Sequence, residues 1–196
     1  MQQAAQRDFL EQNLSREELQ AIRNRRTGLL IFQISWIMAF VCLVIVNWQI
    51  RSTAPQWPPA GVEPVPWALP AVATAALAVS ALQVRRGLRA VHADAQPAFI
   101  RAWQIGLALG AAFIVIMLYE FLVIPYTGVY SDVFRMMTGF HMVHAIAIGY
   151  VLLRVYRGGR AGRYGPLNFW PVEGAAGLWY FVLVAWLLFF VVLYLI

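Results

Sequence analysis

The sequence contains no lysine, one cysteine and three histidines among its 196 residues, and charged side chains make up only 12% of it. A soluble domain usually carries about 25% charged residues. This scarcity of charge therefore excludes an ordinary globular surface that meets water on all sides. The lone Cys42 excludes an internal disulfide and a site built on a pair of cysteine ligands. Because it lies in an apolar stretch, we expect it to be a small buried residue.

Long apolar runs take the place of charge: hydrophobic residues form 61% of the chain, with eight tryptophans. A bilayer core about 30 Å thick is crossed by roughly 20 helical residues. Five runs meet this length, so we predict an all-α polytopic membrane protein, a bundle of five transmembrane helices. The predicted helices are residues 28–50, 66–84, 103–125, 134–156 and 174–196.

Two parts are expected along the chain. Residues 1–27 form a polar cytoplasmic segment that is partly helical, and residues 28–196 form the five-helix transmembrane domain. In the stretch SREEL, Ser15 and Glu18 have the spacing of a helix capping box, which predicts a helix start there. We interpret the polar segment as a surface amphipathic helix that leads into the membrane.

Arginine placement predicts how the helices are oriented. All 15 basic residues are arginines, and 13 of them fall in the N-terminal segment, the second-to-third connection and the fourth-to-fifth connection. The opposite side carries only Arg51 and Arg135. Positive residues accumulate on the cytoplasmic side of membrane proteins. We therefore place the N-terminus in the cytoplasm and the C-terminus outside.

Ionisable residues inside a membrane are candidates for function, because burying them is costly. This chain has Glu120, His141 and His144 within its predicted helices, and Glu173 near the inner edge. The other candidates are assigned to connections: Glu63 and Asp132 to outer ones, His92 and Asp94 to an inner one.

The two neighbouring histidines raise a metal or haem hypothesis. Histidines at positions i and i+3 share one helix face and could both touch one metal ion. They cannot supply both axial ligands of one haem, and a zinc or copper site would need further ligands at the same depth. The favoured interpretation is that neighbouring side chains or backbone groups hydrogen-bond both histidines.

Depth along the helices suggests a partner for His141. Counted at 1.5 Å per residue, Glu120 lies about 7–8 Å and His141 roughly 10 Å below the outer edge, on helices joined by a short loop. We predict that they pair, since pairing lowers the cost of burying both groups. For Glu173 we expect contact with inner-loop arginines or capping of its own helix. The ionisable groups do not continue across the membrane, so a pump or channel within this chain alone is not expected.

Two short motifs stand out in the chain, TGFHMVH (138–144) and WPPAG (57–61). They resemble TGFHGLH and WPPPG of subunit III of the haem–copper oxidases, a family that reduces oxygen with cytochrome c or quinol as the electron donor. FIVIMLYEF (113–121) resembles the family's helix with a QxxE pattern; Glu120 falls on the glutamate and Met117 replaces the glutamine. EGAAGLWYFVLVAW (173–186) and GLLIFQISWIMAF (28–40) resemble EAAAWYWHFVDVVW and GMWLFLASEVMFF.

The chain departs from the family pattern at three polar positions. Trp36 stands in place of a membrane glutamate, Tyr180 in place of a histidine and Leu183 in place of an aspartate. Five helices also resemble the form of the family that lacks the first two of seven helices, a loss that preserves the predicted orientation.

The resemblance implies an accessory subunit in a bacterial cytoplasmic membrane, with no cofactor, metal or catalytic residue of its own. Haem and copper would belong to partner subunits. The expected partners are catalytic subunit I, other oxidase subunits and phospholipid, and the expected role is support of proton uptake. We expect Glu120, His141, His144 and Glu173 to be buried polar residues, and Arg85, Arg154 and Arg157 to contact lipid headgroups.

Two alternatives stay open at this point. One is the related accessory subunit of a nitric oxide reductase. The other is a free-standing membrane enzyme or transporter that uses Glu120, His141 and His144.

Overall fold

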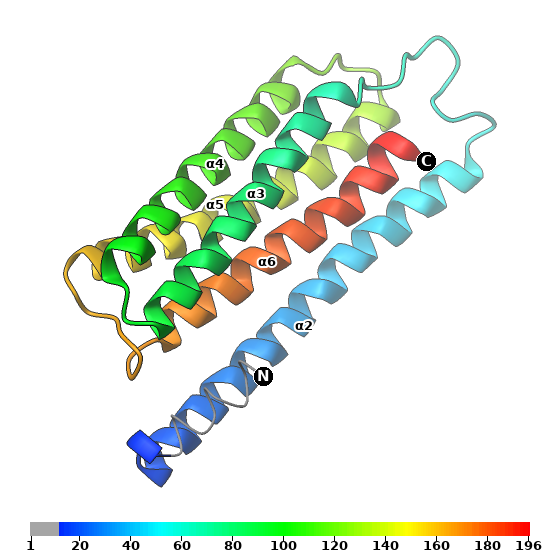
Figure 1. Ribbon diagram of the computed structural model, residues 1–196. Helices are drawn as coiled ribbons and strands as arrows, with labels where there is room; N and C mark the ends of the chain where they lie inside the picture. The colour runs from blue at the N-terminus through cyan, green and yellow to red at the C-terminus, as the bar shows by residue number, and fades with distance from the viewer. Residues whose placement is uncertain (1–11) are drawn as a thin grey trace.

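The computed structural model describes residues 12–196, and over this range it is helical with no strand (Figure 1). Five helices are long and apolar enough to cross a membrane, as the hydropathy pattern predicts. They are α2 (Arg16–Thr53), α3 (Ala68–His92), α4 (Gln96–Val123), α5 (Val129–Arg160) and α6 (Trp170–Phe190), the last continued by the π-helical turn η1 (Val191–Leu195).

The helices extend beyond the predicted spans. Helix α3 continues two turns past residue 84 and ends at His92, which is therefore helical and not in a loop; its ring contacts that of Phe169, with centroids 4.9 Å apart. Asp132 lies in the first turn of α5 and not in an outer connection. Hydropathy detects only the apolar part of a helix, whereas backbone hydrogen bonding continues into the polar ends.

Helix α2 begins where the capping box predicts. The Ser15 hydroxyl accepts from the backbone N–H of Glu18 at 3.2 Å, and the Glu18 carboxylate accepts from the backbone N–H of Ser15 at 2.8 Å. From Arg16 onward the polar segment and the first apolar run form one continuous helix. The expectations for residues 1–11 lie outside the described residues.

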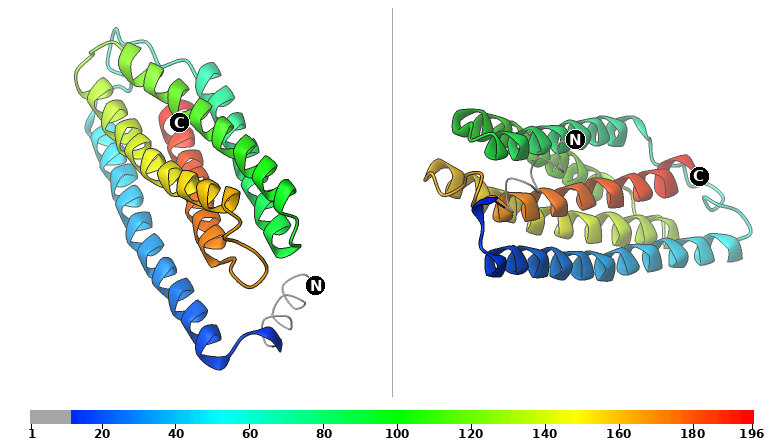
Figure 2. Two further views of the ribbon diagram at one scale, coloured as in Figure 1. Left: turned by 90° about the vertical axis from the view of Figure 1, so that its left-hand side faces the viewer. Right: turned by 60° about the horizontal axis from the view of Figure 1, so that its bottom comes forward.

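Helices α3 to α6 form a four-helix bundle, and α2 lies along one side of it next to α6 (Figures 1 and 2). The start of α2, the α3–α4 connection and the α5–α6 connection lie at one end of the molecule, which is thus rich in arginine. The opposite end carries the long 54–67 connection and the C-terminus.

Tryptophans hold the bundle together through their ring N–H groups. Trp103 donates to the backbone oxygen of Leu152 at 3.0 Å and joins α4 to α5. Trp179 donates to Ser80 at 3.0 Å and joins α6 to α3. Indole N–H groups need a partner when they are buried, so these bonds fix which helices are neighbours.

Cys42 is exposed on α2, so the expectation that it is buried is wrong. Few residues of α2 are buried, Phe40 and Ile22 among them, and many of its other apolar residues are exposed. In a membrane this surface faces lipid or a partner chain, and an apolar environment does not require burial inside the protein.

Candidate functional site

His141 and His144 lie inside the bundle on α5 and are only 1% and 3% exposed. Aromatic rings enclose them. His144 stacks on Trp36 of α2, with centroids 5.0 Å apart and planes at 27°. His141 packs against Trp186 of α6 at 5.3 Å and meets the edge of Phe113 of α4 at 5.8 Å.

Ring contacts, not hydrogen bonds, surround these histidines. Both ring nitrogens of His141, and Nδ1 of His144, are buried without a hydrogen-bond partner among the described residues. The interpretation that neighbouring groups hydrogen-bond both histidines is therefore wrong. No group of three or more His, Cys, Asp or Glu side chains gathers in residues 12–196 in a way that could hold a metal ion.

Glu120 is buried at 6% exposure, but its partner is Tyr194 of η1. The Tyr194 hydroxyl donates to Oε2 of Glu120 at 2.9 Å. Since neither nitrogen of His141 has a partner, the predicted Glu120–His141 pair is wrong. The two residues were placed at similar depth, but depth does not fix the direction of a side chain around its helix axis. His141 points among the core rings, whereas Glu120 reaches the end of α6.

Glu173 lies in the first turn of α6, where a negative charge complements the helix dipole. Both of its carboxylate oxygens accept from Arg26 of α2 at 2.9 Å. The expectation was contact with inner-loop arginines or capping of its own helix, and the ion pair with Arg26 of α2 takes the place of an inner-loop arginine. Glu173 is half-buried and not buried as expected. The two side chains are 45% and 29% exposed, so this pair contributes at most about 1 kcal/mol in water.

Arg85, Arg154 and Arg157 are exposed at the arginine-rich end of α3 and α5. A cavity of about 460 Å³ opens between α2, α5 and α6 at this end. Its polar rim includes Arg154, Arg163, Tyr164 and Trp170, and its other lining residues are mainly apolar. Basic groups beside an apolar hollow match the chemistry of an anionic headgroup attached to acyl chains.

Three polar contacts between helices had no signal in the sequence. Tyr194, which donates to Glu120, is 74 residues away from it in the sequence. Arg26, which pairs with Glu173, is 147 residues away. Arg51 donates to the backbone oxygen of Val192 at 2.9 Å and to that of Ile196. Such contacts depend on which helices are neighbours, which hydropathy alone does not specify.

Comparison with known proteins connects this architecture to a family. A family model described as cytochrome c oxidase subunit III matches residues 6–196. Cytochrome c oxidase subunit 3 of Thermostichus vulcanus is 34% identical over 174 residues, which cover 87% of this chain and 86% of that protein. The Synechocystis sp. protein of the same name is 27% identical over 176 residues, covering 87% and 75%. That of Branchiostoma lanceolatum is 31% identical over 180 residues, covering 86% and 68%.

Proposed function

The chain belongs to the cytochrome c oxidase subunit III family, and we propose that it is an accessory, cofactor-free subunit of a respiratory haem–copper oxidase. In this role it packs on the catalytic subunit in a bacterial cytoplasmic membrane. The observation that carries the proposal is the extent of the family match, which spans residues 6–196 and thus all five helices.

The environment of the histidines supports a packing role for the TGFHMVH segment. Trp36, Phe40 and Phe181 all place rings against His144, with centroids 5.0 to 5.3 Å away. A ligand histidine needs one nitrogen aimed at its metal and usually a second-shell partner on the other. Here the His144 ring of α5 instead packs against rings of α2 and α6, and so joins the three helices.

We also propose that the subunit holds phospholipid at its arginine-rich end. The cavity of about 460 Å³ beside Arg154 and Arg163 supports this assignment. Guanidinium groups form bidentate hydrogen bonds with phosphate. Trp170 and Tyr164 are amphipathic rings of the kind that lie at membrane interfaces. Arg157 and Arg85 extend the basic surface at the same end.

Finally, we propose that the subunit supports proton uptake by the oxidase during oxygen reduction. Among the described residues, no hydrogen bond links the buried ionisable side chains Glu120, His141 and His144 to one another. The effect would thus act through the partner subunit and its lipid boundary, not through a relay inside this chain.

Isolation of the intact complex tests the proposal most directly. A tag on this chain should co-purify haem-containing subunits in mild detergent, seen as haem absorption in the tagged fraction. Removing the chain should leave the haem spectrum unchanged and slow proton uptake during turnover in liposomes. A stable haem-free homo-oligomer with turnover of its own would overturn the assignment.

The lipid assignment is tested separately. Replacing both Arg154 and Arg163 with glutamine should lower the amount of anionic phospholipid that co-purifies with the complex, measured by lipid mass spectrometry. Arg101→Gln, another exposed arginine outside this cavity, is the matched control. Unchanged lipid content in the double variant would contradict the assignment.

A further inference from the structure

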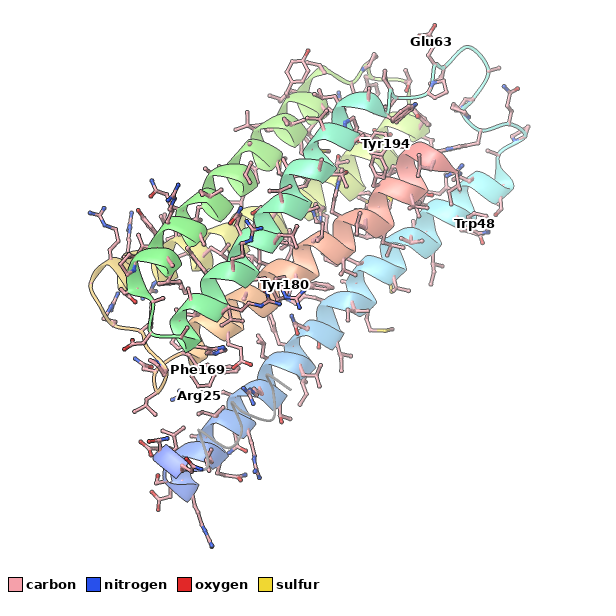
Figure 3. All side chains as sticks on the ribbon, in the orientation of Figure 1. Arg25, Trp48, Glu63, Phe169, Tyr180 and Tyr194 are labelled. Atoms are coloured by element: carbon pink, nitrogen blue, oxygen red, sulfur yellow. The ribbon has the colours of Figure 1, made fainter. Side chains whose placement is uncertain are left out.

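A second cavity lies at the opposite end of the bundle, and neither the oxidase assignment nor the lipid proposal uses it. Its volume is about 530 Å³, within the range of small-molecule sites. The connection residues 61–66 form one wall, and the other walls come from Leu69 of α3, the end of α4 and the start of α5. Figure 3 shows Glu63 on this connection, at the same end of the molecule as Tyr194.

The connection is held in place over the cavity. The backbone N–H of Val65 donates to the Tyr130 hydroxyl at 3.1 Å, and both residues line the cavity. Prolines at positions 64 and 66 restrict the backbone on both sides of that bond. The wall is therefore fixed at its centre and does not depend on side-chain packing alone.

Glu120 supplies a fixed acceptor inside this cavity. Tyr194 donates to Oε2 at 2.9 Å and so sets the orientation of the carboxyl group. The other oxygen, Oε1, accepts no hydrogen bond from any described residue. It is not fully buried either, so part of its surface is accessible. Glu120 lines the cavity, so this second oxygen is the one left open to an occupant.

The charged residues that line the cavity all have one sign. Glu63 and Glu120 are its only lining residues with a formal charge, and it has no arginine or histidine. The remaining lining residues are apolar apart from Thr127 and the phenols of Tyr119 and Tyr130. An anionic group would meet two carboxylates and no counter-charge in the lining, because Arg135 of α5, which donates to the backbone oxygen of Ile124 at 2.8 Å, is not one of the lining residues. A cation would gain a charge-assisted hydrogen bond and contact with aromatic rings.

We propose that this cavity binds an apolar molecule carrying one protonated primary amine. The ammonium donates to the open oxygen of Glu120, and the apolar body lies against Leu69, Val123 and the proline-rich wall. Glu63 at the rim favours entry of the cation and disfavours acids. This site differs in place and in charge preference from the arginine-lined cavity at the other end.

Binding of radiolabelled dodecylammonium to the full chain, in the complex with which it co-purifies, tests the proposal. We expect saturable binding that unlabelled dodecylamine displaces and that dodecanol and dodecanoate do not. Glu120→Gln keeps the shape of the side chain but removes its charge, and should weaken binding by about tenfold or more. Glu17→Gln, on the exposed first turn of α2, should bind as the wild type does.

A second variant covers the case in which Glu120→Gln fails to fold. Leu69→Trp leaves both carboxylates in place and fills part of the cavity from the rim of α3, so it should also weaken binding by about tenfold. Equal affinity in Glu120→Gln or Leu69→Trp and in the wild type would overturn the proposal. So would displacement of the label by dodecanol at the concentration at which dodecylamine acts.

Binding measured in lipid nanodiscs distinguishes two sources of the ammonium group, a membrane aminophospholipid and a free apolar amine. If a membrane aminophospholipid is the natural occupant, phosphatidylethanolamine discs should lower dodecylammonium binding relative to phosphatidylcholine discs, in the wild type but not in Glu120→Gln. If a free apolar amine is the occupant, the two kinds of disc should give the same affinity. Each result supports an ammonium site and assigns its source.

Discussion

Trp36 and His144 lie face to face, with ring planes 27° apart, and they connect α2 to α5. Trp36 is also the residue that departs from the family pattern by replacing a membrane glutamate. A ring in this position packs against the histidine, whereas a carboxylate would have to be neutralised or paired inside the membrane. The substitution thus changes a polar neighbour of His144 into an apolar one.

We expect His144→Phe to be tolerated. Nδ1 of His144 has no hydrogen-bond partner among the described residues, so replacing the imidazole with an apolar ring leaves no group unpaired. Because the phenyl ring is somewhat larger than imidazole, stability should fall by about 1 kcal/mol, the low end of the cost of enlarging a core side chain. Thermal unfolding of the purified complex measures this, and its haem spectrum should be unchanged. Loss of a haem band from assembled complex would refute the packing role.

Truncating Trp36 should have a larger effect. Trp36→Ala removes the ring that stacks on His144 and contacts Phe140 at 5.7 Å. We expect a loss of about 3 kcal/mol, at the low end for aromatic truncation because Trp36 is only half-buried. Trp36→Phe should recover part of this loss, and Trp48→Ala, an exposed tryptophan on the same helix, is the control. Equal melting temperatures for Trp36→Ala and Trp48→Ala would contradict the stacking argument.

Helices of the bundle approach one another closely at several glycines, and Gly110 is one of them. A Cβ atom added to Gly110 of α4 would lie 2.6 Å from Cζ2 of Trp179 on α6, which is fully buried. Trp179 also donates to Ser80 of α3, so this point joins three helices. The absence of a side chain at Gly110 is what permits the contact.

Gly110→Ala should therefore destabilise the chain by about 1–3 kcal/mol, because the Trp179 ring must move and its bond to Ser80 is strained. Gly149→Ala on α5 is the matched control, since the nearest atom to its added Cβ is 4.0 Å away. Thermal unfolding of the two variants in the same detergent compares them. A lower melting temperature for Gly149→Ala would show that the close approach is not the cause.

Helix α2 is joined to the rest of the chain by a few polar contacts along its length. Arg26 binds Glu173, Gln33 donates to the backbone oxygen of Gly177 at 3.0 Å, and Arg51 donates to that of Val192. All three partners belong to α6 or η1. Because α2 buries so few side chains, we expect these contacts to determine how firmly it is held.

Arg51→Ala should loosen the C-terminal end of α2 without unfolding the bundle. Backbone amides of residues 45–53 should exchange hydrogen about tenfold faster, whereas those of α4 should keep the wild-type rate. Hydrogen exchange read by mass spectrometry gives both rates in one experiment. Uniformly faster exchange in all five helices would mean that the contact supports the whole fold and not one helix end.

At the scale of the whole molecule, the arginine-rich connections lie at one end and residues 54–67 at the other. The side of the membrane that each end faces remains a prediction from the positive-inside rule. Cysteine labelling tests it in intact cells, with Cys42→Ser as the background. A membrane-impermeant maleimide should label Glu63→Cys in intact cells and Arg160→Cys only after permeabilisation. The reverse pattern would invert the predicted orientation.

The sequence by itself determined three features: the number of helices, the location of most arginines at one end of the bundle, and the resemblance to the family. These features depend on local properties: the length of an apolar run, the position of charged residues next to it, and short motifs. The start of α2 belongs to the same class, because a capping box involves side chains three residues apart.

Only the tertiary structure decided which polar groups meet. Glu120 bonds to Tyr194 and not to His141, Glu173 pairs with Arg26, and the histidines are enclosed by rings from α2, α4 and α6. Sequence spacing gives the depth of a residue along its helix. The rotation of each helix about its axis, and therefore its contacts, is set by how all five helices pack together.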